Sequence, residues 1–585
     1  AWAVAIVAVL GLFSDRFINA FNNWYENILE RYKKGVGHFV KRPWLSMGLV
    51  VASIGGLFWM MQVTPTTLVP TEDTGTIMGM VSMPPGTSQD RTDKVLQDVE
   101  KMVMASPLVR NTMVISGFSM MGGQGPSYGS FFIRLKPWEE RNAVTESAKM
   151  VFINLLLESQ KSFKDAQVFF FQPPMIMGYG MTNGFTLNLQ DRTGGELSKF
   201  KEVATDFIAE LSKRPEIQSA QTTFDTKFPQ YIIDIDAAQC KRAGISPRDI
   251  LSTLQGYFGG LYSSNFNRFG KIYRVIVQAE FSARTNIESL NNIKVRNSRG
   301  EMAPITQFMT LTPTEGPDNI NRFNMFTSIS INGNPANGYT SGQAIQAVEE
   351  VAKESLPVGY TYEYSGLTRE EQSSSGSTTA IVFGLCFLFI YLLLAAQYES
   401  YLLPLAVLLS VPFGLLGSFI FIQGIGSLSL LPGMAGQIMG AVFGEAQNNI
   451  YVQIALIMLI GLLAKNAILI VEFALDRRKM GMSITAASLH GAAARLRPIL
   501  MTSLAMIIGL LPMMFAFGVG ANGNRSLGTT AIGGMLIGMI CQIFVVPALF
   551  RIFQGLQERI KPMDFSDLHN EIGRASCRER VFRAV

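Results

Sequence analysis

A lysine stands near the middle of a segment that is apolar enough to cross a membrane. The segment, LIMLIGLLAKNAILIVEFAL at residues 456–475, contains Lys465. About 14 residues, or roughly 20 Å of helix, separate Lys465 from the start of the span at Tyr451. Because the hydrocarbon core is only about 30 Å thick, the ammonium group cannot easily reach either surface. A charge at that depth costs at least about 2.5–3.5 kcal/mol, so we expect a functional lysine. The alternative is a structural lysine, paired with a carboxylate that fixes helix packing.

A charged Lys465 needs an acidic partner inside the membrane, because an isolated buried lysine is driven toward its neutral form. Glu472 lies on the same helix face but about 10.5 Å along the axis, too far for a direct ion pair. The next span offers Arg495 and Thr502, which are seven residues apart and share a face, but neither can neutralise a lysine. No other predicted span has a central Asp or Glu. We therefore expect the carboxylate in a part of the protein outside this chain.

A membrane lysine and a carboxylate that takes up a proton together form a proton-driven switch. Protonating the acid releases the lysine and lets the helices shift, and deprotonation restores the pair. Two simpler interpretations stay open. Arg495 could be an ordinary anchor at the cytoplasmic surface, and the Thr502 hydroxyl could bond back to its own helix.

Two apolar stretches in the polar part of the chain are suited to binding apolar molecules. The first, MVISGFSMMGGQGPSYGSFF at residues 113–132, combines a glycine-rich loop, predicted to be mobile, with methionine and phenylalanine. The second is VFFFQPPMIM at residues 168–177. Flexible surfaces rich in Met and Phe adapt to varied ligands. The alternative is that these residues form the core of a strand and a hairpin.

The composition indicates an integral membrane protein with a large soluble part. Of 585 residues, 48% are hydrophobic and only 16% are charged, and the mean hydropathy is +0.24. Soluble proteins carry about a quarter charged residues. The net charge of +5 is mild and forms no basic block interleaved with aromatic residues, so nucleic-acid binding is not indicated. The three histidines are scattered and the four cysteines form no CxxC, so we expect no metal site.

Hydropathy predicts one span near residues 44–63 and five more at 378–396, 401–423, 451–475, 497–517 and 527–550. The basic pair Lys41-Arg42 precedes the first span, and a loop rich in arginine follows Lys465's span. By the positive-inside bias both lie in the cytoplasm, which puts the intervening 300 or so polar residues outside. Residues 1–13 are expected to be a truncated span, so that the chain begins partway through a longer protein. Residues 424–450 are predicted to form a re-entrant or interfacial loop.

Within the polar part, a strand–helix–strand pattern recurs three times, with helices predicted at 88–105, 196–213 and 342–354. Such units favour small α+β domains of the split-βαβ, ferredoxin-like type. A different stretch, ending near residue 311, lies between the second and third copies and is predicted to form a separate module.

Several runs resemble the second half of the resistance-nodulation-division (RND) drug exporters of the hydrophobe/amphiphile branch. They are GLLAKNAILIVEFALDRR, RLRPILMTSLAMIIGLLPM, PTEDTG, MPPGTS, FPQYIIDID, LAAQYES and VVPALF, and the resemblance extends from about Lys41 to about Arg559. It implies the inner-membrane subunit of a Gram-negative bacterium: a homotrimeric, proton-driven antiporter without a cofactor. It also implies a periplasmic adaptor protein and an outer-membrane channel as partners, and small hydrophobic or amphiphilic substrates.

The resemblance and the hydropathy together predict the following domains. They are a truncated transmembrane helix (1–13), a cytoplasmic amphipathic helix (14–42), a transmembrane helix (43–64), a first porter subdomain (65–182), a second porter subdomain (183–228 with 312–368), a docking subdomain (229–311), a five-helix transmembrane block (369–555) and a cytoplasmic tail whose end resembles read-through (556–585).

The resemblance also implies roles for particular residues. Lys465, Arg495 and Thr502 match the proton-relay positions, whose acidic partners are a pair of aspartates in the first half of the pump. Residues expected to line the deep drug pocket are Met113, Ile115, Phe118, Met120 and Phe132, with a switch loop near 116–125 that contains Gly117, Gly122 and Gly123; Phe169 and Phe171 match the access pocket. Met113 and Met120 stand where phenylalanine is usual, and Gly178 where an acid is usual, which leaves the substrate range open.

Two other functions remain as alternatives. A heavy-metal exporter of the same superfamily would use some of the 30 methionines to bind a soft ion such as Cu(I), but that branch usually has a glutamate where Lys465 stands. A membrane-anchored periplasmic scaffold would leave the central lysine without a role. No spacing of a nucleophile and base, or of metal ligands, indicates an enzyme.

Overall fold

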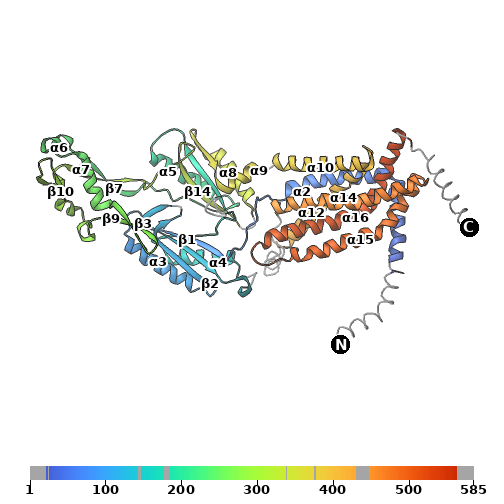
Figure 1. Cartoon of the computed structure of the whole chain (residues 1–585), viewed down its shortest axis with the longest axis horizontal. Helices are drawn as coiled ribbons and strands as arrows, with labels where there is room; N and C mark the ends of the chain where they lie inside the picture. Colours follow the sequence, from blue (N-terminus) through green and yellow to red (C-terminus); the bar gives the residue numbers. More distant parts are fainter. Residues whose placement is uncertain are drawn as a thin grey trace, which may run out of the picture.

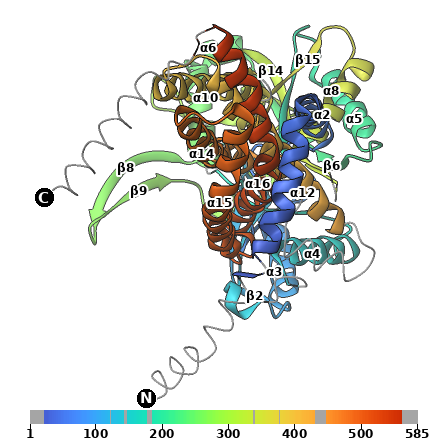
Figure 2. The same ribbon diagram turned by 90° about the vertical axis from the view of Figure 1, so that its right-hand side faces the viewer.

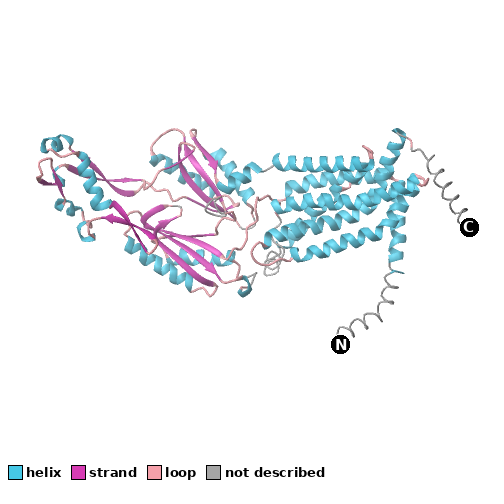
Figure 3. Cartoon of the chain, in the orientation of Figure 1, coloured by secondary structure: helices cyan, strands magenta, loops and turns pink. Residues whose placement is uncertain are grey.

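The computed structural model describes residues 22–562 except 24, 121, 142–145, 177–178, 180–183, 337–338, 375–376, 430–446 and 561. The strands gather at one end of an elongated molecule, and the long apolar helices lie side by side at the other (Figures 1 and 3). The predicted truncated span at 1–13, most of the predicted outer loop, Gly178 and the tail from 563 lie outside the described residues.

A first sheet is built from two β-α-β units in succession. The elements are β1 (Thr76–Ser82), α3 (Gln89–Met104), β2 (Val109–Ser119), β3 (Gly123–Leu135), α4 (Ala148–Ser162) and β4 (Gln167–Phe171). The strand order is β2-β3-β1-β4, with every neighbouring pair antiparallel. One face packs on α3 and α4, where Ile77, Phe131 and Ile133 are fully buried. The other face therefore carries the alternate residues of each strand.

A second sheet has the same plan, although a separate module interrupts it in sequence. Its elements are β5 (Phe185–Asp191), α5 (Leu197–Leu211), β6 (Ile217–Gln221), β13 (Asn321–Phe323), β14 (Phe326–Pro335), α8 (Ser341–Ser355) and β15 (Tyr360–Tyr364). The main path runs β13-β14-β5-β15, and β6 also pairs with β14. Phe185, Phe200 and Phe207 fill the core between this sheet and its helices.

The count of three β-α-β copies was wrong, because β3, α4 and β4 form a fourth. The strand β3 has the sequence GQGPSYGSFFIRL, whose glycines and proline favour a loop when sequence alone is considered. Tertiary pairing overrides that preference, since β3 is bonded to β1 on one side and to β2 on the other.

The inserted module begins and ends on a two-stranded ribbon of β7 (Phe228–Ile235) and β12 (Met309–Gly316). Its small core surrounds Cys240 and Ile250 on the helices α6 (Ala237–Ala243) and α7 (Pro247–Leu254). The hairpin of β8 (Leu261–Arg268) and β9 (Lys271–Val277) projects away from the rest of the chain (Figure 2). The other short elements are η1 (Trp138–Glu140), η2 (Gln255–Gly259), η3 (Phe281–Ala283), η4 (Ile287–Asn292), β10 (Lys294–Arg296), β11 (Met302–Pro304) and η5 (Ile305–Gln307).

Among the described residues, six helices are long and apolar enough to cross a membrane. They comprise α2 (Pro43–Val63), α10 (Ser377–Tyr398), a span made of α11 (Leu403–Leu408) and α12 (Val411–Ser429), α14 (Ile450–Lys479), α15 (Ile484–Met514) and α16 (Ala521–Ile560). The short helix α9 (Gly366–Ser374) precedes α10. Before α2, residues 25–41 are helical, and Tyr32 donates a 2.7 Å hydrogen bond to the carbonyl of Ile543 on α16.

The helix that contains the predicted span at 497–517 begins well before that span. The helix α15 begins at Ile484, not near residue 497, and the Ser483 side chain caps it by accepting from the Ala486 amide. The charged residues before 497 lowered the local hydropathy and hid this first part of the helix. The predicted cytoplasmic loop thus shrinks to the few residues between Lys479 and Ile484, and Arg495 lies within α15.

Small residues let the central helices approach closely. A Cβ added to Gly538 on α16 would lie 2.8 Å from the Cα of Gly414 on α12, so only glycine fits there. Such close contacts between small residues are typical of helix packing in membranes. By contrast, few described residues pack on α10, and only 6% of its most apolar segment is buried.

Candidate functional site

Lys465 lies on a stripe of α14 that no described residue covers. The exposed members of this stripe are Ile454, Met458, Gly461, Lys465 and Glu472, which are three, four or seven residues apart and so share one face. Among the residues that the structure describes, none forms a hydrogen bond or an ion pair with Lys465. The face that carries this lysine is therefore open for a further element to pack on.

A buried hydrogen bond joins α14 to α15 next to this lysine. The Asn466 amide donates to the Ser503 hydroxyl at 3.0 Å, and both side chains are buried. The two helices run in opposite directions, so the residue that precedes each member of this pair points to the same side. Those residues are Lys465 and Thr502, and both are exposed. The structure thus brings these two predicted relay residues to one level and one side of the helix pair.

The hydroxyl of Thr502 bonds to its own helix. It donates to the carbonyls of Pro498 at 3.0 Å and Ile499 at 3.2 Å. A threonine hydroxyl inside a helix commonly bonds back to a carbonyl three or four residues earlier in this way. This is the simpler interpretation of Thr502 that the sequence left open, although the residue is exposed.

Arg495 lies about two helical turns from Lys465, toward the C-terminal end of α14. Its guanidinium carbon is 4.8 Å from the ring centroid of Phe473 on α14, and Phe473 is eight residues, or about 12 Å, beyond Lys465. The buried Nε of Arg495 has no hydrogen-bond partner among the described residues. Arg495 therefore does not contact Lys465 or Thr502, and it lies on the same helix pair near the C-terminal end of α14.

Five of the seven residues predicted to bind substrate lie in two cross-strand rows on the open face of the first sheet. In one row, Phe132 pairs with Met113 on one side and Met78 on the other, and Met78 pairs with Phe171. In an antiparallel pair, residues directly opposite each other point to the same face. This row therefore joins residues predicted for two different pockets into one continuous apolar strip.

The second row runs parallel to the first. Ser130 pairs with Ile115 and with Met80, and Met80 pairs with Phe169. Met80 is nearly inaccessible, at 2% exposure, and its sulfur accepts a 3.6 Å hydrogen bond from the Ser119 hydroxyl. The exposed end of the face lies near Met113, which is 53% exposed.

The predicted loop at 116–125 is mostly a β-hairpin. The strand β2 continues to Ser119 and β3 begins at Gly123, with a register shift between Ser116 and Phe118. Gly117 and Gly123 have φ angles of +76° and +86°, which favour glycine, so they form the bulge and the turn. A Cβ on Gly122 would lie 3.0 Å from the Tyr128 ring. Phe118 is 36% exposed and Met120 is half-buried.

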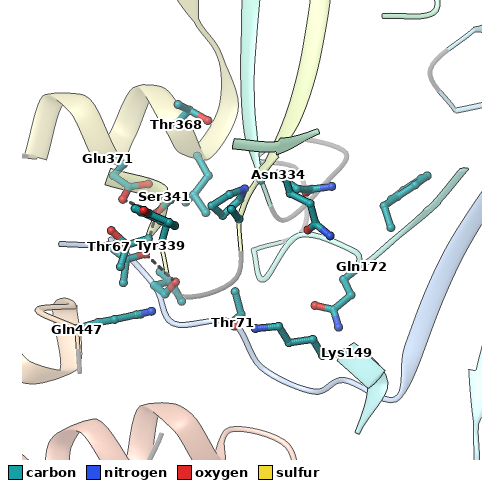
Figure 4. Close-up of a pocket in the computed structure, with 18 of the residues that line it drawn as sticks. Thr67, Thr71, Lys149, Gln172, Asn334, Tyr339, Ser341, Thr368, Glu371 and Gln447 are labelled. Atoms are coloured by element: carbon teal, nitrogen blue, oxygen red, sulfur yellow. Dashed lines mark hydrogen bonds between the residues drawn. The ribbon is translucent and has the colours of Figure 1, made fainter. Parts of the chain in front are cut away.

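A polar cavity of about 130 Å³ lies between the linker after α2, the two sheet domains, α9 and Gln447, which shortly precedes α14. Figure 4 shows Glu371, Ser341 and Thr67 on one wall and Lys149 and Gln172 on another. Phe171, at the end of the first apolar row, also lines it.

The Ser341 hydroxyl donates to Glu371 at 2.6 Å. Burial raises the pKa of Glu371, and the bonds from Ser341 and the Leu68 backbone oppose that rise.

Sequence reasoning missed several residues of this site. The methionines outside the predicted pocket were considered only as possible metal ligands, although the alternation of Met78 and Met80 in the strand β1 puts both on one face of the sheet. Asn466 and Ser503 were not predicted, because a single uncharged polar residue in an apolar span does not indicate which residue of another span it bonds. Across the described residues, no cluster of three or more His, Cys, Asp or Glu side chains could hold a metal ion.

The sequence profile of the AcrB/AcrD/AcrF family matches residues 8–554. Among curated proteins, the chain is 34% identical over 539 residues to the toluene efflux pump membrane transporter TtgB of Pseudomonas putida, covering 91% of this chain and 49% of that protein. It is 32% identical over 550 residues to the multidrug export protein AcrF of Escherichia coli, covering 92% and 51%. It is 31% identical to the multidrug resistance protein MdtF of E. coli O157:H7, covering 92% and 50%. The chain thus spans about half the length of the curated relatives that it matches.

Proposed function

The chain belongs to the AcrB/AcrD/AcrF family, and on that premise we propose that it is part of a proton-driven exporter of hydrophobic and amphiphilic compounds. The family membership also confirms the resemblance to RND exporters. Two relatives are named for toluene efflux and multidrug export, which supports apolar substrates of varied shape.

One observation carries the proposal: Lys465 and Thr502 are exposed at one level and on one side of the α14–α15 pair, which the Asn466–Ser503 bond holds together. A carboxylate on a helix packed over this side would pair with Lys465 when ionised and release it when protonated. That carboxylate would come from a part of the full-length protein that this chain does not contain. Arg495, nearer the cytoplasm, would give protons a polar exit.

The open face of the first sheet is the proposed substrate site. Its two rows present thioether and aromatic side chains, which bind apolar molecules without demanding one shape. The cavity beside Glu371 meets the first row at Phe171, so an amphiphile leaving the membrane surface could reach the rows through it.

The remaining parts of the assignment follow from the family. The two sheets would be porter subdomains of the split-βαβ type (65–182, and 183–228 with 312–368), and the inserted module (229–311) a docking subdomain. The pump would work as a homotrimer in the inner membrane of a Gram-negative bacterium, with a periplasmic adaptor and an outer-membrane channel. It would use the proton gradient and no cofactor.

Export of a soft cation is a second candidate, because Met78, Met80 and Met113 share the open face and thioethers bind Cu(I). Transport assays that compare a lipophilic dye with Cu(I) distinguish the two functions. Uptake of Cu(I) alone would favour the metal exporter.

The test uses the full-length protein that contains this chain, reconstituted in liposomes with an imposed proton gradient and a fluorescent lipophilic dye. We expect Lys465→Ala to lower transport by about 100-fold or more, the scale of losing a proton-transfer group, while size-exclusion chromatography still shows the trimer. Lys479→Ala, which changes an exposed lysine at the end of the same helix, should transport normally. Wild-type transport by Lys465→Ala would refute the relay.

A further inference from the structure

The carboxylate of Glu72, just before the first sheet, caps the outer end of α16. Its two oxygens accept hydrogen bonds from the backbone amides of Asn522 at 3.1 Å and Gly523 at 2.7 Å. The Asn522 side chain in turn donates to the Thr71 carbonyl at 2.5 Å. An anion at a helix N-terminus satisfies amides that have no partner within the helix and complements the helix dipole. Glu72 therefore binds the polar part of the chain directly to a membrane helix.

The capped end of α16 is fastened to the helix that carries Lys465. Asn449, the N-cap of α14, donates through its side chain to the Ser526 hydroxyl on α16 at 3.0 Å. A Cβ on Gly523 would lie 2.9 Å from the Tyr451 ring, so the first turns of α14 and α16 are in direct contact. The first turn of α14 is therefore attached to the turn of α16 that Glu72 caps.

The linker before Glu72 is also bound to the start of α14. Thr66 and Asn448 form an isolated parallel β-bridge. The Thr67 amide donates to the Asn448 carbonyl at 3.1 Å, and the Ile450 amide donates to the Leu68 carbonyl at 3.1 Å. The linker is thus hydrogen-bonded to the start of α14, in addition to the contact between Glu72 and α16.

The next residue, Asp73, is fixed in the opposite direction, to the first sheet and its helix. Its carboxylate accepts from both terminal nitrogens of Arg141 at 3.3 Å and from the amide of Ala148, the first residue of α4, at 2.7 Å. The Arg141 side chain is 1% exposed. Strand β1 starts at Thr76, three residues on, and carries Met78 and Met80 of the two apolar rows. Adjacent carboxylates therefore cap a membrane helix and a helix of the sheet domain.

We infer that Glu72 is a positioning residue that couples movement of the α14–α16 unit to β1 and so to the substrate face. The inference rests on the proposed proton-driven transport, since it names the contact that would carry the movement. Charge-assisted bonds of this kind are among the stronger ones in proteins, and a path of only three residues separates Glu72 from the start of β1 at Thr76. Glu72 itself would touch neither proton nor substrate.

The first experiment separates coupling from binding. In the full-length protein, Glu72→Ala should lower kcat for dye export by about tenfold or more, the scale of losing one charge-assisted hydrogen bond, with KM unchanged. Glu72→Gln, which keeps an acceptor oxygen, should recover part of the rate and serves if the alanine variant does not fold. Glu202→Ala, an exposed glutamate on α5, is the matched control. An unchanged kcat for both Glu72 variants would overturn the inference.

The second experiment measures the coupling without substrate. Two pairs of spin labels are attached at exposed sites. The first pair, at Tyr401 and Met480, reports a distance within the membrane part. The second pair, at Met104 and Val358, reports the distance between the two sheet domains. In the wild type, both distances should change between acidic and neutral pH. In Glu72→Ala the first change should persist and the second should be lost. A sheet-domain response equal to that of the wild type would overturn the inference alone. No response of the membrane pair in the wild type would refute the proton-driven switch, and the coupling with it.

Discussion

Asn466 and Ser503 form a direct hydrogen bond between two membrane helices, with the amide nitrogen 3.0 Å from the hydroxyl oxygen. Both side chains are at most 5% exposed, so neither can exchange this bond for one to water. The contact fixes how α14 and α15 are rotated against each other, and that rotation brings Lys465 and Thr502 to the same side. The orientation of Lys465 and Thr502 in the proposed relay thus depends on two residues whose side chains do not ionise.

This pair should contribute a measurable coupling energy. In a double-mutant cycle of Asn466→Ala and Ser503→Ala, we expect about 0.6 kcal/mol and at most roughly 1.7 kcal/mol, as for hydrogen bonds between membrane helices. Denaturant unfolding in detergent measures it. Asn466→Ala combined with Ser488→Ala is the control, because Ser488 is buried in the same helix but donates to Pro547 on α16. The assignment fails if both cycles are equally additive.

Thr502 offers a way to separate a relay hydroxyl from a structural one. Its bonds to Pro498 and Ile499 would satisfy it without any transport role. If the hydroxyl relays protons, Thr502→Val should lower dye export by about 100-fold, and Thr502→Ser should retain most of it.

The control for this prediction is Thr530→Val. Thr530 bonds back to its own helix in the same manner, donating to the Ser526 carbonyl at 2.6 Å, but it is buried on α16 rather than exposed beside Lys465. Its loss should leave transport within about twofold of the wild type, since a hydroxyl that bonds only its own helix is a local interaction. Equal transport by both valine variants would make Thr502 structural.

The membrane spans, the amphipathic helices and the strands could be predicted from the sequence to different extents. Long apolar runs identified every span that the structure describes, because the cost of exposing polar groups in lipid leaves few other arrangements. The predicted helix at 342–354 is α8, Ser341–Ser355, since its amphipathic period is regular. The strand β3 was missed because its glycines argue against a strand until β1 and β2 bond to it.

The site was predictable only in part. Lys465 is conspicuous because a charge in lipid is costly, whereas the partners of Glu72 lie 450 residues away in sequence and no local pattern indicates them. Likewise, resemblance put Met113 and Phe171 in different pockets, and only the strand register shows that they belong to one row.

Side chains of the two apolar rows should set substrate affinity rather than turnover. Truncating Phe132 or the exposed Met113 removes apolar contact worth about 1.5–3 kcal/mol when fully buried. We expect Phe132→Ala to raise KM for a bulky lipophilic dye by about tenfold and Met113→Ala by less, because Met113 is 53% exposed before substrate binds. Dye export at varied concentration measures both. Met104→Ala, on the outer side of α3, is the control, and a fall in kcat with constant KM would argue against a binding role.

Glu371 should make stability depend on pH in a direction that its burial dictates. Burial raises its pKa above the ordinary value of 4.5, against the opposing bonds from Ser341 and Leu68. Its contribution to stability is therefore complete below the unfolded pKa and is lost as the pH rises through the higher folded-state value. Glutamine cannot ionise, so Glu371→Gln should gain Tm relative to the wild type as the pH rises through that window. Thermal unfolding of the full-length protein in detergent across this range measures the difference.

Glu370→Gln, on the exposed side of the same helix, should show no such trend. A Tm difference that stays constant with pH for Glu371→Gln would mean that the carboxyl group has the same pKa in the folded and unfolded protein, and so that burial in the cavity does not favour its neutral form.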